Sequence, residues 1–109
     1  MRVFAGSVAL AALLIADGWR GATAAGDVEL GKYLSSECVT CHQATGIAAA
    51  GVPAIVGMPD DQFSALMNSY KAKERDNAVM QTIAGRLKDE DIAALAAYFG
   101  GLKPRAKKN

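Results

Sequence analysis

The single histidine of this chain directly follows one of its two cysteines, and this placement constrains the fold more than any other feature. Residues 38–42 read CVTCH. Two thiols three positions apart can reach the two vinyl groups on one edge of a porphyrin, and the next residue can turn its imidazole onto the iron. The spacing therefore predicts one covalently attached haem, with thioether bonds at Cys38 and Cys41 and an axial iron ligand at His42.

Three other interpretations of the paired cysteines compete with this one. A thioredoxin-type redox pair belongs at the start of a helix that follows a strand, and no β-branched run precedes Cys38. A structural zinc site needs four ligands, whereas the chain has two cysteines and one histidine. A plain disulfide fits the spacing, but it leaves the position of His42 unexplained. The alternatives stay open, and the haem interpretation is favoured.

The first 24 residues have the pattern of a cleaved secretory signal peptide. Arg2 supplies a positive start, Val3–Ala16 is an uncharged apolar run, and Ala22–Ala24 matches the A-x-A pattern of a cleavage site. We expect cleavage after Ala24 or one residue later, and export to the periplasm. An uncleaved anchor is the alternative, but about 14 apolar residues are fewer than the roughly 20 that span a bilayer. No stable membrane insertion is expected after cleavage.

Charge is unevenly distributed along the rest of the chain. The formal net charge of +1 gives no general attraction to nucleic acid, so no nucleic-acid partner is expected. Four basic side chains lie within residues 103–109, which we interpret as a flexible basic tail. Residues 25–102 then form a single acidic domain.

Apolar side chains recur with helical spacing in several short segments of this domain. Helices are expected at 28–37, at about 60–72 and at about 90–99, with a short helix or loop at 77–87. Asp27 and Asp89 are the expected N-caps of the first and last helices, and Gly100-Gly101 is the expected left-handed stop. Gly31 costs about 1 kcal/mol relative to Ala in mid-helix, so it indicates either a close helix contact or a tolerated defect.

Two segments favour loops. Residues 43–53 contain two glycines and a proline, and we expect this loop to cover one side of the haem. The charged run at 71–77 is interpreted as a solvated turn, with a dedicated partner site as the alternative. No segment alternates with period two over the length of a strand. The expected fold class is therefore all-α, with about 3–5 short helices and loops wrapped around one haem.

A second axial ligand has to come from a methionine sulfur or a lysine amine, because there is no second histidine. Met67 lies on an apolar helix stripe, where a methionine usually fills the core. Met58 follows His42 by only 16 positions, which makes the far haem face awkward to reach. Met80 follows it by 38 positions, after an intervening helix, and is the favoured ligand.

An iron with both axial positions filled by protein has no vacant site for a substrate. One-electron transfer, without catalysis by this chain itself, is then the expected function. The alternative is a haem enzyme, a peroxidase or a gas-binding protein, in which Met80 is displaceable.

Four segments carry a family resemblance: CVTCH at 38–42, VPAIVG at 52–57, VM at 79–80 and LKDEDIAALAAYF at 87–99. With them the chain resembles a small bacterial class I c-type cytochrome. Within that class, PAIVGMPDDQF at 53–63 and YKAKER at 70–75 are similar to the cytochrome subunit of flavocytochrome c sulfide dehydrogenase. The resemblance extends over nearly the whole chain beyond the signal peptide.

The resemblance implies a class I cytochrome c fold with one haem c, Met80 as its sixth ligand, and one haem edge exposed for electron exchange. It also implies that the first and last helices cross near Gly31 and Tyr98, and that a flavoprotein partner passes electrons from sulfide to the haem. The chain departs from the family pattern in three ways: its first helix reaches Cys38 one residue early, and two residues differ. Lys73 stands where a glycine is expected, and Lys88 replaces the usual capping Ser or Thr.

Overall fold

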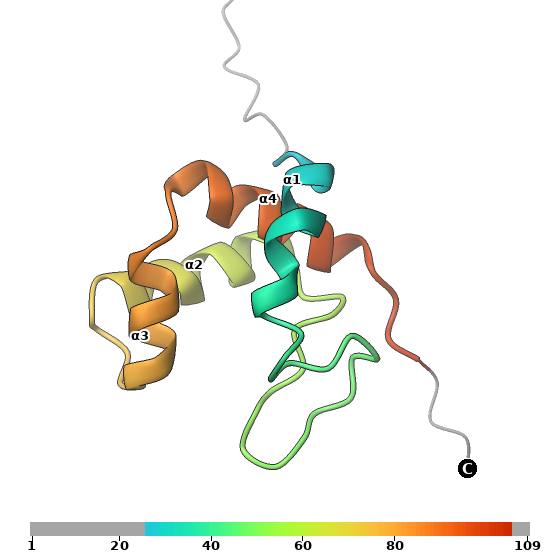
Figure 1. Ribbon diagram of the computed structural model, residues 1–109, viewed down its shortest axis with the longest axis horizontal. Coiled ribbons are helices and arrows are strands. Elements are labelled where there is room, and N and C mark those ends of the chain that lie inside the picture. The colour runs from blue at the N-terminus through green and yellow to red at the C-terminus, as the bar shows by residue number, and fades with distance from the viewer. Residues whose placement is uncertain (1–25, 106–109) are drawn as a thin grey trace, which may run out of the picture.

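The computed structural model describes residues 26–105, so the expected signal peptide and residues 106–109 lie outside the described part. The helices are α1 (Val28–Leu34), continued by the 3₁₀ turn η1 (Ser35–Glu37), then α2 (Asp60–Lys71), α3 (Ala78–Gly85) and α4 (Asp89–Gly101). Between residues 26 and 105 there is no strand, only an isolated bridge between Ala49 and Val52. The expected all-α class is confirmed (Figure 1).

The first and last helices pack directly against each other at Gly31. This residue is buried, and a Cβ added there would overlap the carbonyl oxygen of Ala94 and lie 2.7 Å from Tyr98 Cβ. Only glycine permits so close an approach of the two backbones. Of the two explanations for Gly31, the close helix contact is therefore confirmed, at the crossing point that the family resemblance implies (Figure 1).

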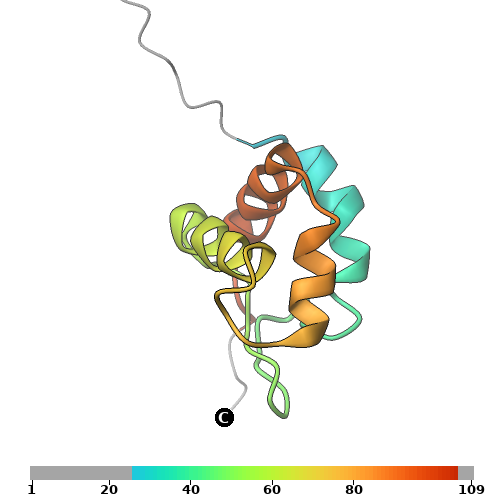
Figure 2. The same cartoon turned by 90° about the vertical axis from the view of Figure 1, so that its left-hand side faces the viewer.

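The core lies where α4 packs against α1 and α2. The Phe63 and Phe99 rings stack with centroids 5.9 Å apart, and Tyr98 meets Phe99 edge-on at 5.2 Å. The buried hydrophobic core residues are Ile55, Val56, Phe63, Met67, Ala84, Ile92, Leu95, Ala96 and Phe99. Among the helices, α3 packs against α2 (Figure 2). The core is thus centred on α4, and α3 joins it through α2.

The ends of α1 and α4 test the predicted caps. Asp27 caps α1 as expected, since its Oδ1 accepts hydrogen bonds from the N–H groups of Glu29 and Leu30 at 3.0 and 3.2 Å. The expected N-cap of α4 was wrong by one residue: Lys88 occupies that position, and Asp89 is the first helical residue. The Lys88 N–H donates to Asp91 Oδ2 at 2.9 Å, so a carboxylate in the first turn supplies the cap.

The expected left-handed stop at Gly100-Gly101 was also wrong, because α4 continues through Gly101 and ends at Leu102 in extended conformation. Gly100 has a different role. A Cβ there would overlap Asp60 Oδ1 and lie 3.1 Å from the Met58 carbonyl oxygen. The glycine therefore lets the start of α2 approach α4.

Helix α2 ends in a left-handed turn at Lys73, whose φ is 59°. The Lys73 N–H donates to the Tyr70 carbonyl at 3.0 Å, and the Glu74 N–H donates to the Ser69 carbonyl at 2.9 Å. These two bonds are the pair of a Schellman motif, in which glycine usually takes the left-handed position. The lysine thus stands at the position where the family resemblance expects a glycine.

The segment between η1 and α2 has no regular structure, as expected for 43–53, and it is tied to the C-terminal part of the chain. The Gly57 N–H donates to the Phe99 carbonyl at 2.8 Å, and the Arg105 N–H donates to the Thr45 carbonyl at 2.8 Å. The start of the basic tail therefore lies against this loop. None of the helices between residues 26 and 105 has the length and apolar character needed to cross a bilayer.

Candidate functional site

A cavity of about 630 Å³ lies between the CVTCH segment, α2 and α3. This volume is within the range of pockets for small molecules and cofactors. Most of its lining is apolar. The lining residues are Cys38, Cys41, His42, Gly51, Val52, Pro53, Ile55, Met58, Gln62, Phe63, Leu66, Met67, Tyr70, Arg75, Asn77, Val79 and Met80. The four residues predicted from the sequence as haem-binding therefore meet at one cavity.

Residues 38–42, which we call the attachment segment, continue the helical turn of η1. The Cys38 N–H donates to the Ser35 carbonyl at 2.9 Å, and the Cys41 and His42 N–H groups donate to the Cys38 carbonyl at 3.2 and 2.8 Å. Positions i, i+3 and i+4 of a helical turn share one face. Both thiols and the imidazole consequently line the same cavity wall.

Both cysteines are free thiols in the structure. Burial, and secondarily the negative charge of Glu37, raises the pKa of Cys38 from 9.0 to about 11. A thioredoxin-type pair needs a thiol with a lowered pKa, because the thiolate is the nucleophile. The surroundings of Cys38 therefore disfavour the redox-pair interpretation.

His42 is oriented by the loop that follows it. Its Nδ1 lies 2.7 Å from the carbonyl oxygen of Pro53, a contact that the sequence left open. A carbonyl can only accept, so Nδ1 carries the proton and Nε2 keeps its lone pair. A metal-ligating imidazole is typically held in this way. His42 is thus prepared to bind a metal through Nε2.

The cavity brings together all three methionines found between residues 26 and 105. Met67 is 6% exposed and belongs to the core, as its place on an apolar stripe predicts, and Met58 packs against that core. Met80 lies in the first turn of α3, where its N–H donates to Asn77 Oδ1 at 3.0 Å. The attachment segment and α3 both contribute residues to the cavity lining, and Figure 1 shows them as separate parts of the backbone.

One end of the cavity carries a cation that sequence reasoning missed. Arg75 Nε donates to Tyr70 Oη at 2.9 Å, and the guanidinium lies 5.5 Å from the Tyr70 ring centroid. The remaining guanidinium N–H groups of Arg75 could donate to an anion in the cavity, for which a fork of N–H groups is well suited. The charged run 71–77 was interpreted as solvated. The sequence offered one signal for Arg75: it follows Tyr70, the last aromatic residue of α2, by only five positions.

The donor set fits a haem. Two thiols and an imidazole with a free Nε2 share one wall, methionine sulfurs are present in the lining, and the remaining wall is mainly apolar. Arg75, a cation in the lining, would receive the carboxylates of the porphyrin. The chain therefore offers partners for the iron, the vinyl groups, the ring faces and the carboxylates.

A family model described as cytochrome c matches residues 28–103. The chain is 35% identical over 75 residues to a thiosulfate dehydrogenase electron acceptor of Thiomonas intermedia, a match that covers 67% of this chain and 35% of that protein. It is 32% identical over 79 residues to the cytochrome subunit of sulfide dehydrogenase of Chlorobaculum tepidum, covering 72% of this chain and 69% of that protein.

A solved structure shares the fold. The thiosulfate dehydrogenase from Marichromatium purpuratum superposes with a TM-score of 0.67 at 28% identity, over 75% of this chain and 20% of that chain. The chain spans 35% of the length of the thiosulfate dehydrogenase electron acceptor and 20% of the length of the solved chain. The similarity is thus to one domain of these longer proteins.

Proposed function

The chain belongs to the cytochrome c family, which implies a covalently bound haem c, and from this premise we propose that it is an exported single-haem carrier of electrons. In this proposal Cys38 and Cys41 form the thioether bonds, and His42 and Met80 are the axial iron ligands. Its relatives include an electron acceptor and a haem subunit of dehydrogenases. No catalysis by this chain itself is required.

The observation that carries the proposal is the meeting of these four residues at one mainly apolar cavity. Met67 is the least suitable methionine because it is part of the buried core, whereas Met58 and Met80 both pack against that core. Met80 is chosen over Met58 because it follows His42 by 38 positions rather than 16 and belongs to a separate short helix. This length of chain would allow Met80 to reach the face of the porphyrin opposite His42.

His42 contributes a fixed imidazole to the mechanism. The Nδ1–H bond to the Pro53 carbonyl holds the ring orientation and directs Nε2 to the iron. It also increases the basicity of the ligating nitrogen. When bound, the haem supplies an iron that changes between two oxidation states and so carries one electron.

Met80 and the apolar wall would determine the reduction potential of the haem. A thioether sulfur favours the reduced iron and raises the potential relative to a second imidazole. Apolar lining residues such as Phe63 and Leu66 keep water away from the ring. With both axial positions filled by side chains, no position remains for a substrate, which suits electron transfer rather than chemistry at the iron.

Export is the second part of the proposal. Residues 1–24 have the pattern of a signal peptide, and covalent haem attachment then accompanies secretion to the periplasm. N-terminal sequencing of the protein purified from its source should begin at Ala25 or Gly26. A mature protein that still begins at Met1 would contradict the cleavage.

For the electron donor, we propose the flavoprotein subunit of a sulfide dehydrogenase. The similarity to a cytochrome subunit of sulfide dehydrogenase covers more than two thirds of both chains and supports this choice. The protein purified from its source should bring a flavoprotein with it, and sulfide should reduce its haem only when that flavoprotein is present. If a thiosulfate dehydrogenase reduces the haem without any flavoprotein, the proposed donor is wrong. The role of the chain as an electron carrier would be unaffected.

The ligand assignment is tested by replacing each methionine in turn. Met80→Ala should abolish the six-coordinate low-spin spectrum and allow carbon monoxide to bind the reduced protein. Met58→Leu and Met67→Leu conserve volume and should keep the native spectrum. An unchanged spectrum in Met80→Ala would show that another side chain is the ligand. Carbon monoxide binding to the native reduced protein at neutral pH would favour the haem-enzyme alternative.

Covalent attachment has its own measurement. The mass of the denatured protein should exceed that of the polypeptide by one haem. A mass without this increment would contradict both thioether bonds and favour a haem-free interpretation of the cysteines.

A further inference from the structure

Helix α3, which carries Met80, is anchored mainly on one side. It packs against α2, and polar contacts reinforce that side: Gln81 Nε2 donates to the Arg75 carbonyl at 3.0 Å, and Lys71 Nζ donates to the Leu87 carbonyl at 2.6 Å. An eight-residue helix is marginal by itself and depends on such contacts. The position of Met80 therefore depends on what holds α3 on its other side.

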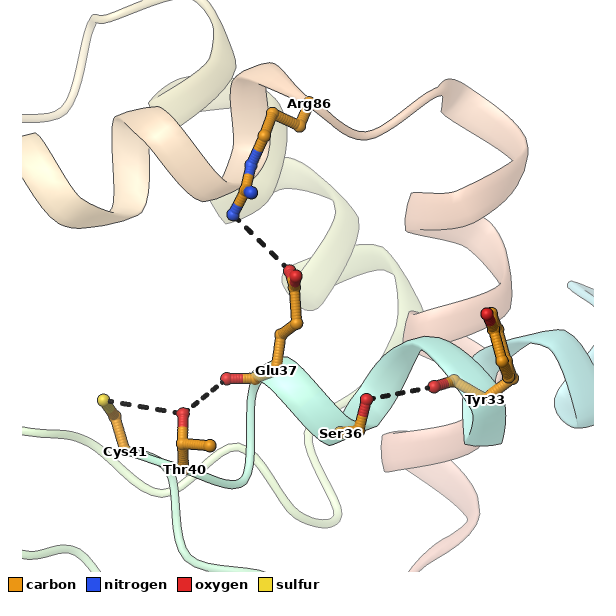
Figure 3. Close-up of polar contacts among 6 residues, drawn as sticks. All are labelled: Tyr33, Ser36, Glu37, Thr40, Cys41 and Arg86. Carbon is orange, nitrogen blue, oxygen red and sulfur yellow. Dashed lines mark hydrogen bonds and ion pairs between the residues drawn. The ribbon is translucent and has the colours of Figure 1, made fainter.

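On that other side, one ion pair connects α3 to the part of the chain that carries His42. Arg86, the residue after α3, places Nη2 3.5 Å from Glu37 Oε2 (Figure 3). Within residues 26–105, this pair is the one ion pair or hydrogen bond between residues 27–42 and residues 77–88. The two partners are 49 positions apart in the sequence.

Glu37 is in turn rigidly connected to the attachment segment. It directly precedes Cys38, and its carbonyl accepts a hydrogen bond from Thr40 Oγ1 at 2.7 Å. Thr40 lies between the two cysteines in the sequence, and Figure 3 shows its hydroxyl between the Glu37 carbonyl and the Cys41 sulfur. The ion pair therefore joins the end of the Met80 helix to the turn that presents both thiols and the imidazole.

We propose that Glu37 and Arg86 are positioning residues that keep α3 closed over the cavity and so keep Met80 at the iron. The inference rests on the proposed function, in which Met80 is the sixth ligand. When the pair is lost, α3 stays attached to α2 but opens more often toward the attachment segment. Local opening of this kind needs no global unfolding.

The size of the effect follows from exposure. The Glu37 and Arg86 side chains are 60% and 59% exposed, and exposed ion pairs contribute about 0.2–1 kcal/mol. Such a contribution changes an opening equilibrium by a factor of up to about five. It is also screened by salt, since exposed charges lose most of their attraction at high ionic strength. The ion pair between Glu37 and Arg86 is therefore weak enough to be sensitive to ionic strength.

The experiment uses imidazole as a competitor for the sixth position in the oxidised holoprotein. Imidazole affinity is measured from the absorption spectrum at about 20 mM and about 500 mM NaCl. At low salt, Glu37→Gln and Arg86→Gln should each increase the affinity by up to about fivefold, and the exchanged pair E37R/R86E should restore the native value. High salt should remove the difference between the native protein and the variants.

The matched control is the ion pair of Lys71 Nζ and Asp89 Oδ1, which is 3.8 Å long, includes an exposed carboxylate and joins α2 to the start of α4. Asp89→Asn should leave imidazole affinity unchanged at both salt concentrations. Hydrogen exchange provides a second measurement. The α3 amides should exchange faster in Glu37→Gln than in the native protein at low salt, whereas the α4 amides should not.

Met80→Ala separates a failure of the ligand assignment from a failure of the positioning role of Glu37 and Arg86. If native protein and Met80→Ala bind imidazole equally well, Met80 is not the ligand and the proposed function fails at that residue. If the native protein is protected but Glu37→Gln and Arg86→Gln bind imidazole as the native protein does, the ligand assignment stands and the positioning role is overturned.

Discussion

His42 and Met80 line the same cavity, but the contacts that hold them differ in kind and in number. His42 belongs to a helical turn continuous with α1, which packs tightly on α4, and its ring is bonded to Pro53 in a loop that is itself tied to α4 and to Arg105. Met80 belongs to a short helix that packs on α2 and reaches the attachment segment through one exposed ion pair.

This difference indicates an order of release. A disturbance of the molecule should free the Met80 side before the His42 side, because the former depends on fewer and more exposed contacts. If His42 and Met80 are the iron ligands, as proposed, the protein would keep the first permanently and the second conditionally. Variants that affect one side at a time can test this contrast.

The largest effect is expected at Gly31, on the His42 side. Gly31→Ala should lower the free energy of unfolding by about 2–3 kcal/mol, because the new methyl group overlaps the backbone of α4 and forces the helices apart. Denaturant unfolding followed by haem absorption measures it. The matched variant is Gly85→Ala in α3, where a Cβ meets nothing within 4 Å and should add about 0.5–1 kcal/mol. Equal effects of the two variants would contradict the tight crossing.

The next effect concerns Arg75, in the link that leads to the Met80 helix. If Arg75 binds a haem carboxylate, Arg75→Gln should destabilise the holoprotein by about 1–2 kcal/mol, because that charge-assisted contact is lost. Arg75→Lys keeps the charge without the planar fork and should recover only part of the stability. Thermal unfolding of the holoprotein checks both. Equal stability of all three proteins would show that Arg75 does not bind a carboxylate.

A smaller effect is expected at the C-terminal contact of the His42 side. Ending the chain after Lys103 removes the Arg105 N–H bond to Thr45 and should cost about 1 kcal/mol. Hydrogen exchange should then accelerate in residues 43–57 but not in α3. Ending the chain after Arg105 is the control and should leave exchange in the loop unchanged. If hydrogen exchange accelerates in α3 instead, the bond between Arg105 and Thr45 does not stabilise the His42 side.

The smallest effect is expected at Lys73, beyond the end of α2. Lys73→Gly should stabilise the protein by about 0.5 kcal/mol, because glycine adopts the left-handed conformation without the strain of a Cβ. Lys73→Ala removes the charge but keeps the Cβ, so it should give no stabilisation. If both variants stabilise equally, charge rather than backbone conformation determines the effect. Imidazole affinity should be unchanged in either.

Local sequence patterns predicted most of the helical architecture. Asp27 capped α1 as expected because an N-cap acts on residues two and three positions away, and the apolar stripe in α2 predicted Met67 in the core. The two cysteines and the histidine lie within five positions of one another, and this spacing predicted that they share one wall of the cavity. Short-range rules suffice where the partners are neighbours in the chain.

Contacts between distant segments were not predictable in this way. Nothing within the sequence around His42 identifies the Pro53 carbonyl as its partner, and Gly100 was taken for a turn because its real constraint is Asp60, 40 positions earlier. The cap of α4 was displaced by one residue, since several acidic residues in a row offer more than one register. Arg75 was missed because its role depends on the shape of the cavity.

The helical turn of the attachment segment has a consequence for how the molecule assembles. Its backbone bonds join residues three or four positions apart, and such local structure forms on a microsecond scale or faster. Closing α3 over the cavity requires a contact between residues 49 positions apart, which is slower because a long stretch of chain must first be ordered. A newly made chain can thus display both thiols and the imidazole together while its other half is still unfolded, and Met80 arrives last.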